Sequence, residues 1–227
     1  MLRARAVLLT ALVVCGVSAS VYAAANLRNR KVKREDIEWT DVWMPNMNDH
    51  ALPRVLLIGD SITRAYFPIV ERKLQGKAYV ARIATSKAIG DRALLAELAV
   101  FLGEARFDVV HFNVGMHGWE YSEDEYRHHL PALVATIRKR APGARLIWAS
   151  TTPVRIDRMP GPSKERIAAR NAIAREYMSK VGIPIDDLYG LMEPHTGLHS
   201  DDIHFNNEGS AMMGDKVADA TAGLLPK

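Results

Sequence analysis

A serine and, far downstream, an aspartate and a histidine are the residues of this chain best suited to chemistry. Ser61 follows Gly59 and Asp60 directly after a short apolar run. About 140 residues later, Asp201 lies three residues before His204. A histidine can take the proton of a serine hydroxyl as a general base, and a carboxylate can hold that histidine in the required tautomer. The set predicts a serine nucleophile and acyl transfer through an acyl-serine intermediate.

Each of these residues also has a simpler interpretation. A serine just after a buried strand is often the N-cap of the next helix, although Gly59 permits a tight turn that presents Ser61 to solvent. The segment from Asp201 to His204 also suits a polar loop before the final helix. The pattern Gly-x-Ser-x-Gly, which is typical of α/β-hydrolases, does not occur in the sequence, so that fold has no support.

The serine must be positioned by a strand, and the sequence predicts one directly before it. Residues 55–58 are all aliphatic, which is typical of a strand buried on both faces of a parallel sheet. From there, strand-like and helix-like segments alternate to the end of the chain. The expected strands are residues 55–58, 78–83, 109–114, 146–150 and 183–186, and the expected helices are residues 65–74, 92–102, 123–140, 162–181 and 207–224.

This alternation predicts one α/β domain with helices on both faces of a central parallel sheet of about five strands. Ser61 would then lie at the carboxyl end of a central strand, where ligands bind in open α/β sheets. Ser122 with Glu125 three residues later predicts a capping box at the start of the helix at 123–140. Gly182 suits the end of the helix at 162–181.

The N-terminal region differs from the rest in composition. Residues 1–25 contain two arginines, then an almost uninterrupted apolar run that ends in three alanines; this is typical of a signal peptide or a membrane anchor. Residues 26–53 form a basic linker and an N-terminal arm, and residues 54–227 form the folded domain. We expect export to the periplasm or the extracellular space, with the N-terminal segment either cleaved or kept as a membrane tether.

Charge and cysteine content exclude several functions. Residues 1–34 hold seven of the 30 Lys and Arg and no acidic residue, whereas residues 36–227 carry 23 basic and 25 acidic side chains. The net charge of +4 therefore comes from the N-terminal region, and the domain gives no support for nucleic-acid binding. The single cysteine, Cys15, lies in the apolar segment, so the domain has no disulfide, thiolate metal site or cysteine nucleophile.

A metal site is a further alternative. His195 and His199 lie close to the paired aspartates at 201 and 202, but their spacing matches no metal-binding motif. A hydrolytic metal site would also leave Ser61 without a function. We therefore expect no metal and no cofactor.

Together these motifs resemble those of the SGNH (GDSL) hydrolase superfamily. Gly59-Asp60-Ser61-Ile62 is similar to its first block and Asp201-x-x-His204 to its last, and the order, the separation and the α/β pattern agree over nearly the whole domain. The resemblance implies a flavodoxin-like three-layer α/β/α sandwich with the activity of an esterase, lipase or carbohydrate acyl hydrolase. It makes Ser61 the nucleophile, His204 the base and Asp201 the residue that orients the base.

The resemblance also implies an oxyanion hole, to which Ser61 contributes its backbone N–H. Gly90 takes the place of the family glycine that donates a second backbone N–H, although it equally suits a loop glycine before a helix. The family block Gly-x-Asn-Asp is replaced here by Gly115-Met116-His117-Gly118. An imidazole N–H can donate to an oxyanion as an amide does. We therefore expect His117 to take over from the asparagine, with Asn113 as a second candidate donor and His111 as a packing residue.

We expect a serine-dependent ester hydrolase that acts on an acylated or acetylated carbohydrate or a small ester. The expected partner is thus a small-molecule or glycan ester, with no nucleic acid, and with membrane contact only through an uncleaved N-terminal segment. Aromatic residues of the arm and of the segment after His117 could stack on sugar rings, although aromatics in such places more often pack in the interior. These residues are Trp39, Trp43, Trp119 and Tyr121.

Two alternatives remain open from the sequence. Gly59-Asp60-Ser61-x-x-Arg64 and Phe112-Asn113-x-Gly115 also resemble polysaccharide O-acetyltransferases, in which a sugar hydroxyl would replace water as the acyl acceptor. The altered block at His117 would also suit a catalytically silent carbohydrate-binding protein on the same fold. The ordered serine, aspartate and histidine favour an enzyme, because a binding protein would not need them.

Overall fold

The structure, a computed structural model, describes residues 32–226. A six-stranded sheet forms the centre of this part of the chain. The strand order is β1-β3-β2-β4-β5-β6. The strands are β1 (Thr40–Trp43), β2 (Arg54–Gly59), β3 (Tyr79–Thr85), β4 (Val109–Phe112), β5 (Arg145–Ala149) and β6 (Ile185–Asp186).

Five of these strands, β2 to β6, run parallel, and β1 pairs with β3 in the antiparallel direction. Without β1, the strands follow the spatial order 2-1-3-4-5, which is that of flavodoxin-like folds. The prediction of a central parallel sheet of about five strands is therefore confirmed. The addition is β1, which comes from the N-terminal arm and covers an edge of the sheet.

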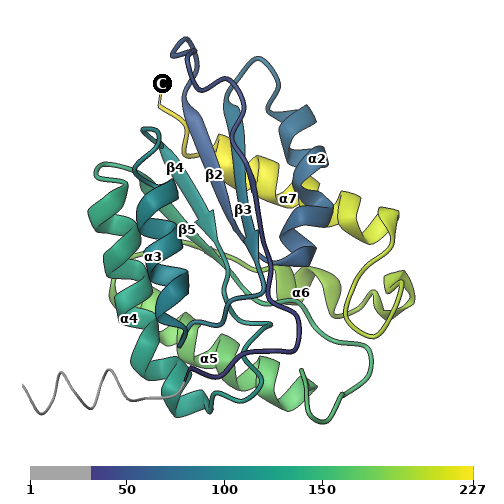
Figure 1. Ribbon diagram of the computed structural model, residues 1–227. Coiled ribbons are helices and arrows are strands. Elements are labelled where there is room, and N and C mark those ends of the chain that lie inside the picture. The colour runs from purple at the N-terminus through teal and green to yellow at the C-terminus, as the bar shows by residue number, and fades with distance from the viewer. Residues whose placement is uncertain (1–31, 227) are drawn as a thin grey trace, which may run out of the picture. The chain divides into compact units, whose positions relative to one another are not determined.

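Helices cover both faces of the sheet (Figure 1). Helices α2 and α7 pack against each other on one face, while α3 and α4 lie side by side with α5 on the other. Short elements, α6 and the 3-10 turn η1, precede α7. The helical elements are α2 (Ser61–Lys73), α3 (Arg92–Phe101), α4 (Glu123–Arg140), α5 (Lys164–Lys180), α6 (Leu188–Met192), η1 (Thr196–Leu198) and α7 (Asn207–Ala222).

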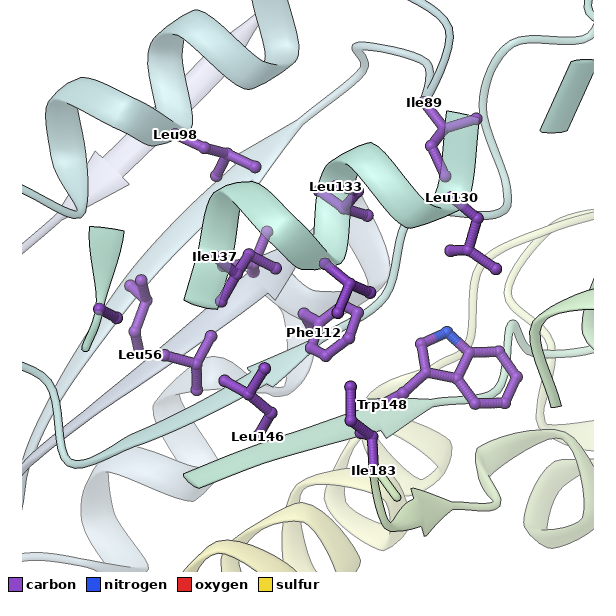
Figure 2. Close-up of a cluster of buried hydrophobic side chains, with 14 of the residues drawn as sticks. Leu56, Ile89, Leu98, Phe112, Leu130, Leu133, Ile137, Leu146, Trp148 and Ile183 are labelled. Atoms are coloured by element: carbon purple, nitrogen blue, oxygen red, sulfur yellow. The ribbon is translucent and has the colours of Figure 1, made fainter. Parts of the chain in front are cut away.

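Two hydrophobic clusters fill the space between these layers. Every residue of β2 is buried, and its alternate side chains enter opposite clusters: Leu56 and Ile58 on the α3–α4 side, Val55 and Leu57 on the α2–α7 side. Figure 2 shows the first cluster, in which leucines of α4 face Phe112 and Trp148 from the sheet. A strand buried on both faces explains why the sequence at 55–58 is continuously aliphatic rather than alternating.

Local sequence signals fix several helix ends. Ser122 and Glu125 form the expected capping box at the start of α4, which satisfies backbone N–H groups that have no partner within the helix. Gly182 follows α5 with a φ of +69°, a left-handed conformation that glycine adopts without a steric penalty. Helix α2 begins four residues before the expected start at residue 65, because Asp60 caps it.

The predicted signal peptide or membrane anchor at residues 1–25 lies outside the described residues. Between residues 32 and 226, no helix is both long and apolar enough to cross a membrane.

Candidate active site

The turn after β2 presents Ser61 at the carboxyl edge of the sheet. Asp60 is buried and caps α2, since its Oδ1 accepts a hydrogen bond of 2.9 Å from the Ile62 N–H. Ser61 is the first residue of α2. A Cβ atom at Gly59 would come 2.0 Å from Thr63 Oγ1, so only glycine lets the helix start this close to the strand. The Gly-Asp-Ser sequence thus forms a tight strand-to-helix turn that carries a serine.

Ser61, His204 and Asp201 form a continuous hydrogen-bonded chain. Ser61 Oγ lies 2.7 Å from His204 Nε2. On the other side of the ring, His204 Nδ1 lies 2.8 Å from Asp201 Oδ2. Because a carboxylate only accepts hydrogen bonds, this contact places the ring proton on Nδ1 and leaves Nε2 as the acceptor for the serine hydroxyl. The structure brings the three predicted residues together with these distances.

The Asp201 carboxylate is held in its ionised form. Burial would raise its pKa, but backbone N–H groups of His204 and Ile203 donate to Oδ1 at 2.7 Å each, and these bonds together with the imidazole lower the pKa to about 2. Asp201 therefore stays negative over the whole range in which an imidazole titrates. A fixed negative charge beside Nδ1 would stabilise an imidazolium form of His204.

Contacts within the loop that carries Asp201 and His204, and directly after it, hold this loop in place. After it, Asn206 caps α7 by accepting from the Gly209 N–H at 3.0 Å. Within it, Asp202 pairs with Arg155 and Arg158, with nitrogen–oxygen distances of 3.2 Å and 2.6 Å. The Asp202 carbonyl also accepts from the Arg155 N–H. The neighbouring aspartates thus have different roles: Asp201 contacts the histidine, and Asp202 ties the loop to the segment after β5.

An open cleft of about 400 Å³ lies over the serine. Its lining comes from four parts of the chain that are far apart in sequence. They are the arm, the start of α2, the segment after β4 and the loop before α7, and they contribute Glu35, Trp39, Ser61, His117, Trp119 and His204. The sequence-predicted His117 therefore shares a cleft with Ser61 and His204.

His117 is oriented by a carboxylate that the sequence did not indicate. Its Nδ1 lies 3.0 Å from each carboxylate oxygen of Glu35. Its Nε2 is buried and has no hydrogen-bond partner among residues 32–226. The ring of Trp39 packs edge-on against the imidazole, with ring centroids 6.4 Å apart. Glu35 thus holds Nδ1 of His117, and Nε2 has no partner in the described chain. His204 is held through Nδ1 in the same way, but its Nε2 contacts Ser61.

A buried arginine of α5 holds the segment that carries His117. Arg170 is almost fully buried, and its guanidinium donates to the carbonyl groups of Gly115, His117, Gly118 and Tyr121 at 2.8–3.0 Å. Arg166, one turn earlier, donates to the carbonyls of Trp119 and Tyr121. Because carbonyl groups away from water need partners, these arginines allow the segment to stay ordered without being a strand or a helix.

Two other predicted donors occupy different positions. Both Asn113 contacts use its amide nitrogen, which donates to the Ala149 carbonyl at 2.7 Å and to Thr151 Oγ1 at 3.0 Å. An amide group has two N–H bonds, so this arrangement favours His117 over Asn113 as the donor. Gly90 packs beneath Tyr121, where a Cβ atom would come 2.3 Å from the ring. It is not one of the described residues that line the cleft, and its donor role stays a prediction.

Other predicted histidine roles are resolved by burial. His111 lies on β4 with no exposed surface, and its Nε2 is 3.0 Å from Asp186 Oδ2, which confirms it as an interior residue. His199 is also buried, with Nδ1 3.1 Å from the Thr196 carbonyl and Nε2 3.2 Å from the Pro153 carbonyl. Residues 32–226 contain no group of three or more His, Cys, Asp or Glu that could hold a metal ion.

Comparison with known proteins agrees with this arrangement. The model of the GDSL-like lipase/acylhydrolase family matches residues 57–212, a range that includes Ser61, His117, Asp201 and His204. The chain belongs to this family. It is thus an esterase or acylhydrolase, an enzyme that hydrolyses ester bonds. No curated protein sequence matches the chain.

Solved structures of low sequence identity share the fold. A lipase/acylhydrolase from Enterococcus faecalis is 20% identical, covering 77% of this chain and 97% of that one, with a TM-score of 0.61. A carbohydrate esterase family 3 protein from Talaromyces cellulolyticus is 16% identical, covering 76% and 97%, with a TM-score of 0.62. The acetyl xylan esterase AlAXEase is 18% identical, covering 74% and 98%, with a TM-score of 0.59. The α/β fold of this chain is therefore that of the GDSL hydrolases.

Proposed function

We propose that this acylhydrolase works through a covalent acyl-serine. Ser61 Oγ attacks the ester carbonyl carbon while His204 Nε2 takes the hydroxyl proton. The tetrahedral intermediate then loses the alcohol, which receives that proton from His204. Water attacks the acyl-serine, again losing a proton to His204, and the proton returns to Ser61 Oγ as the acid leaves. The observation that carries this proposal is the chain of contacts at 2.7 Å and 2.8 Å from Ser61 through His204 to Asp201.

The negative charge of the tetrahedral intermediate needs donors. The first N–H groups of a helix have no partner within it and lie at the positive end of its dipole, which supports the Ser61 N–H, the first of α2, as one donor. His117 is proposed as the side-chain donor, because it lines the cleft beside Ser61 and its Nε2 has no partner in the described chain. The Gly90 N–H is proposed as the third donor, on the resemblance alone.

For the substrate we propose an acylated or acetylated carbohydrate, or a small ester. Trp39 and Trp119 line the cleft with Ser61, and indole faces are suited to stacking on sugar rings. Trp43 and Tyr121 are not among the cleft residues. Two proteins with the same fold are a carbohydrate esterase and an acetyl xylan esterase. Export, proposed from the N-terminal sequence, would bring the enzyme to such polymers.

The nucleophile is tested by labelling with a fluorophosphonate. We expect the full-length protein to gain one adduct, found by intact mass and mapped to the peptide containing Ser61. Ser61→Ala should gain no adduct and should lose at least about 10⁴-fold in turnover of 4-nitrophenyl acetate, since removal of a nucleophile removes nearly all covalent catalysis. An unlabelled wild-type protein with an intact fold would contradict the serine mechanism and favour a silent binding protein.

The acyl acceptor is tested separately. With acetylated xylan oligosaccharides and no added acceptor, a hydrolase releases acetate at a constant rate. With a large excess of unacetylated oligosaccharide, an O-acetyltransferase forms newly acetylated oligosaccharides faster than it forms acetate. Acetate as the sole product would support water as the acceptor.

A further inference from the structure

His117, the second histidine of the cleft, contacts the Glu35 carboxylate, and this contact determines which ring nitrogen carries a proton. Glu35 accepts from His117 Nδ1 with both oxygens at 3.0 Å, so the proton of that contact lies on the Nδ1 side. In a neutral imidazole with a proton on Nδ1, Nε2 carries a lone pair and only accepts. A lone pair would repel the negative oxygen of a tetrahedral intermediate. For His117 to donate from Nε2, the Glu35–His117 pair must hold a second proton.

We propose that Glu35 is a positioning residue of the active site, which fixes the His117 ring and favours the doubly protonated imidazole that donates from Nε2 to the oxyanion. This inference rests on the proposed acyl-serine mechanism and identifies the chemical form of its side-chain donor. A hydrogen bond from a charged group is roughly twice as strong as one from a neutral group. A charged imidazole can therefore do more than replace the family's neutral asparagine amide.

Hydrogen bonds from the segment after β4 and within the arm hold Glu35 in place. The Gly118 N–H, next to His117, donates to Glu35 Oε1 at 3.1 Å. The Glu35 N–H donates to Glu38 Oε1 at 3.2 Å. Farther along the arm, the Trp39 carbonyl accepts from the Ser86 N–H at 3.1 Å, directly before β1 joins the sheet. The carboxylate is thus fixed both to the segment it serves and to the edge of the sheet.

Other charges that face His117 have a mixed effect on its proton. Burial of the ring lowers its pKa most strongly. The hydrogen bond that His117 donates to Glu35 and the negative charges of Asp60, Glu35 and Glu38 act in the opposite direction, and the net effect is a raised pKa. Positive charge near the ring comes from α2, α5 and the loop before α7; the groups are Arg64, which lines the same cleft, Arg170, which binds the His117 carbonyl, and His204 when protonated.

The proposal predicts opposite pH requirements for the two histidines. His204 must be neutral to accept the Ser61 proton, so the reaction needs the form of His204 that dominates on the alkaline side. His117 must be protonated to donate, so activity falls again at higher pH as Nε2 loses its proton. The profile of kcat/KM against pH should therefore be bell-shaped, and the alkaline limb should belong to His117 alone.

Four variants of the full-length protein separate this role from a structural one. Glu35→Gln keeps the shape of the side chain and removes its charge. His117→Asn provides an amide, which donates without titrating. The third variant combines the two substitutions. The matched control is Asp36→Asn, which removes the same charge from the next, exposed position of the arm. The readout is kcat/KM for 4-nitrophenyl acetate from pH 5 to 10, with urea unfolding as the check on folding.

We expect Glu35→Gln to lower activity at neutral pH by about 10- to 100-fold, which is less than the about 10²–10³-fold typical for loss of an oxyanion donor itself, and to move the alkaline limb to lower pH. His117→Asn should lose the alkaline limb and retain more activity than His117→Ala, a fifth variant made for this comparison. In the His117→Asn background, Glu35→Gln should change the rate less than about 2-fold. Asp36→Asn should leave both the rate and the profile unchanged.

Three results would overturn the proposal. One is an alkaline limb that stays at the same pH in Glu35→Gln. Another is an alkaline limb that persists in His117→Asn. The third is an equal loss from Glu35→Gln in both backgrounds, because that would mean Glu35 acts only on the fold of the arm. Failure of the serine mechanism is distinguishable from all three, since the wild-type protein would then gain no fluorophosphonate adduct.

Discussion

The two histidines that line the cleft each contact a carboxylate, and the two pairs differ in origin and in surroundings. His204 and Asp201 are three residues apart on one loop, and their side chains are 40% and 54% exposed. His117 and Glu35 are 82 residues apart, and each side chain is 15% exposed. In each pair the carboxylate holds Nδ1, but the Nε2 of His204 has Ser61 as its partner, whereas that of His117 has none in the described chain.

A third pair shows what the carboxylate alone does not determine. His111 and Asp186 make a similar contact at 3.0 Å, but both side chains are buried in the sheet at 0% and 1% exposure. His111 contacts Asp186 through Nε2, and its Nδ1 faces the interior without a partner in the described chain. In each pair a carboxylate orients an imidazole, but only His117 and His204 of the three histidines line the cleft. The comparison indicates that the position of the histidine relative to the cleft, and not its carboxylate, determines its function.

The largest expected effect comes from breaking the first pair. Asp201→Asn should lower kcat by about 10⁴-fold, because an amide can donate to Nδ1 and so favour the wrong tautomer of the base. The measurement is turnover of 4-nitrophenyl acetate per mole of protein, with urea unfolding to show that the variant is folded. The Asp202→Asn variant is the control, since Asp202 contacts arginines and not the imidazole. A loss of similar size in that variant would assign the effect to the loop.

Breaking the second pair should cost less. His117→Ala removes the proposed oxyanion donor, and loss of one such donor typically lowers kcat by about 10²–10³-fold. Because the group acts on the transition state, KM should change little. Steady-state kinetics on a small ester would measure both constants. Unchanged kcat would remove His117 from the mechanism and leave Glu35 with only a structural role.

Breaking the third pair should affect stability and leave catalysis nearly unchanged. His111→Leu would remove the Nε2 partner of the buried Asp186 carboxylate, which keeps Lys216 Nζ at 3.6 Å from its other oxygen. Loss of one hydrogen-bond partner from a buried acceptor typically costs about 1–3 kcal/mol. We expect a lower urea midpoint, with kcat per labelled site within about 2-fold of the wild type. If the variant does not fold, His111→Gln retains a polar partner and permits the same comparison. A large loss of kcat in a folded variant would contradict the distinction between the pairs.

The sequence predicted what depends on contiguous residues. The aliphatic run before Gly59, the capping box at Ser122 and the pair Asp201 and His204 are each local, and the structure contains each of them. The edge strand β1 was not expected, because a four-residue strand containing an aspartate has no distinctive pattern. Helix α6 is similarly short.

The residues that sequence reasoning missed at the site act across long distances. Glu35 lies in a charged arm with no motif around it, and only the fold brings it to His117. Arg170 lies on a helix rich in arginine and lysine, where nothing in the sequence marks it as buried. The sequence indicated only that Arg170 lies on the buried face of the helix. Ile167, three residues before it, and Ala174, four residues after it, are both apolar and lie on the same helix face. Pairing of distant polar residues is not encoded in periodicity.

The two edge strands of the sheet also affect whether the molecule associates with copies of itself. A sheet edge presents unpaired N–H and C=O groups that another chain can join, and long, flat edges promote aggregation. Here the outermost strands are β1, with four residues, and β6, with two. β1 also carries Asp41, which forms an ion pair with Arg82 of β3. A chain shortened to begin at residue 54 would expose the seven residues of β3 instead, and self-association through that edge would follow.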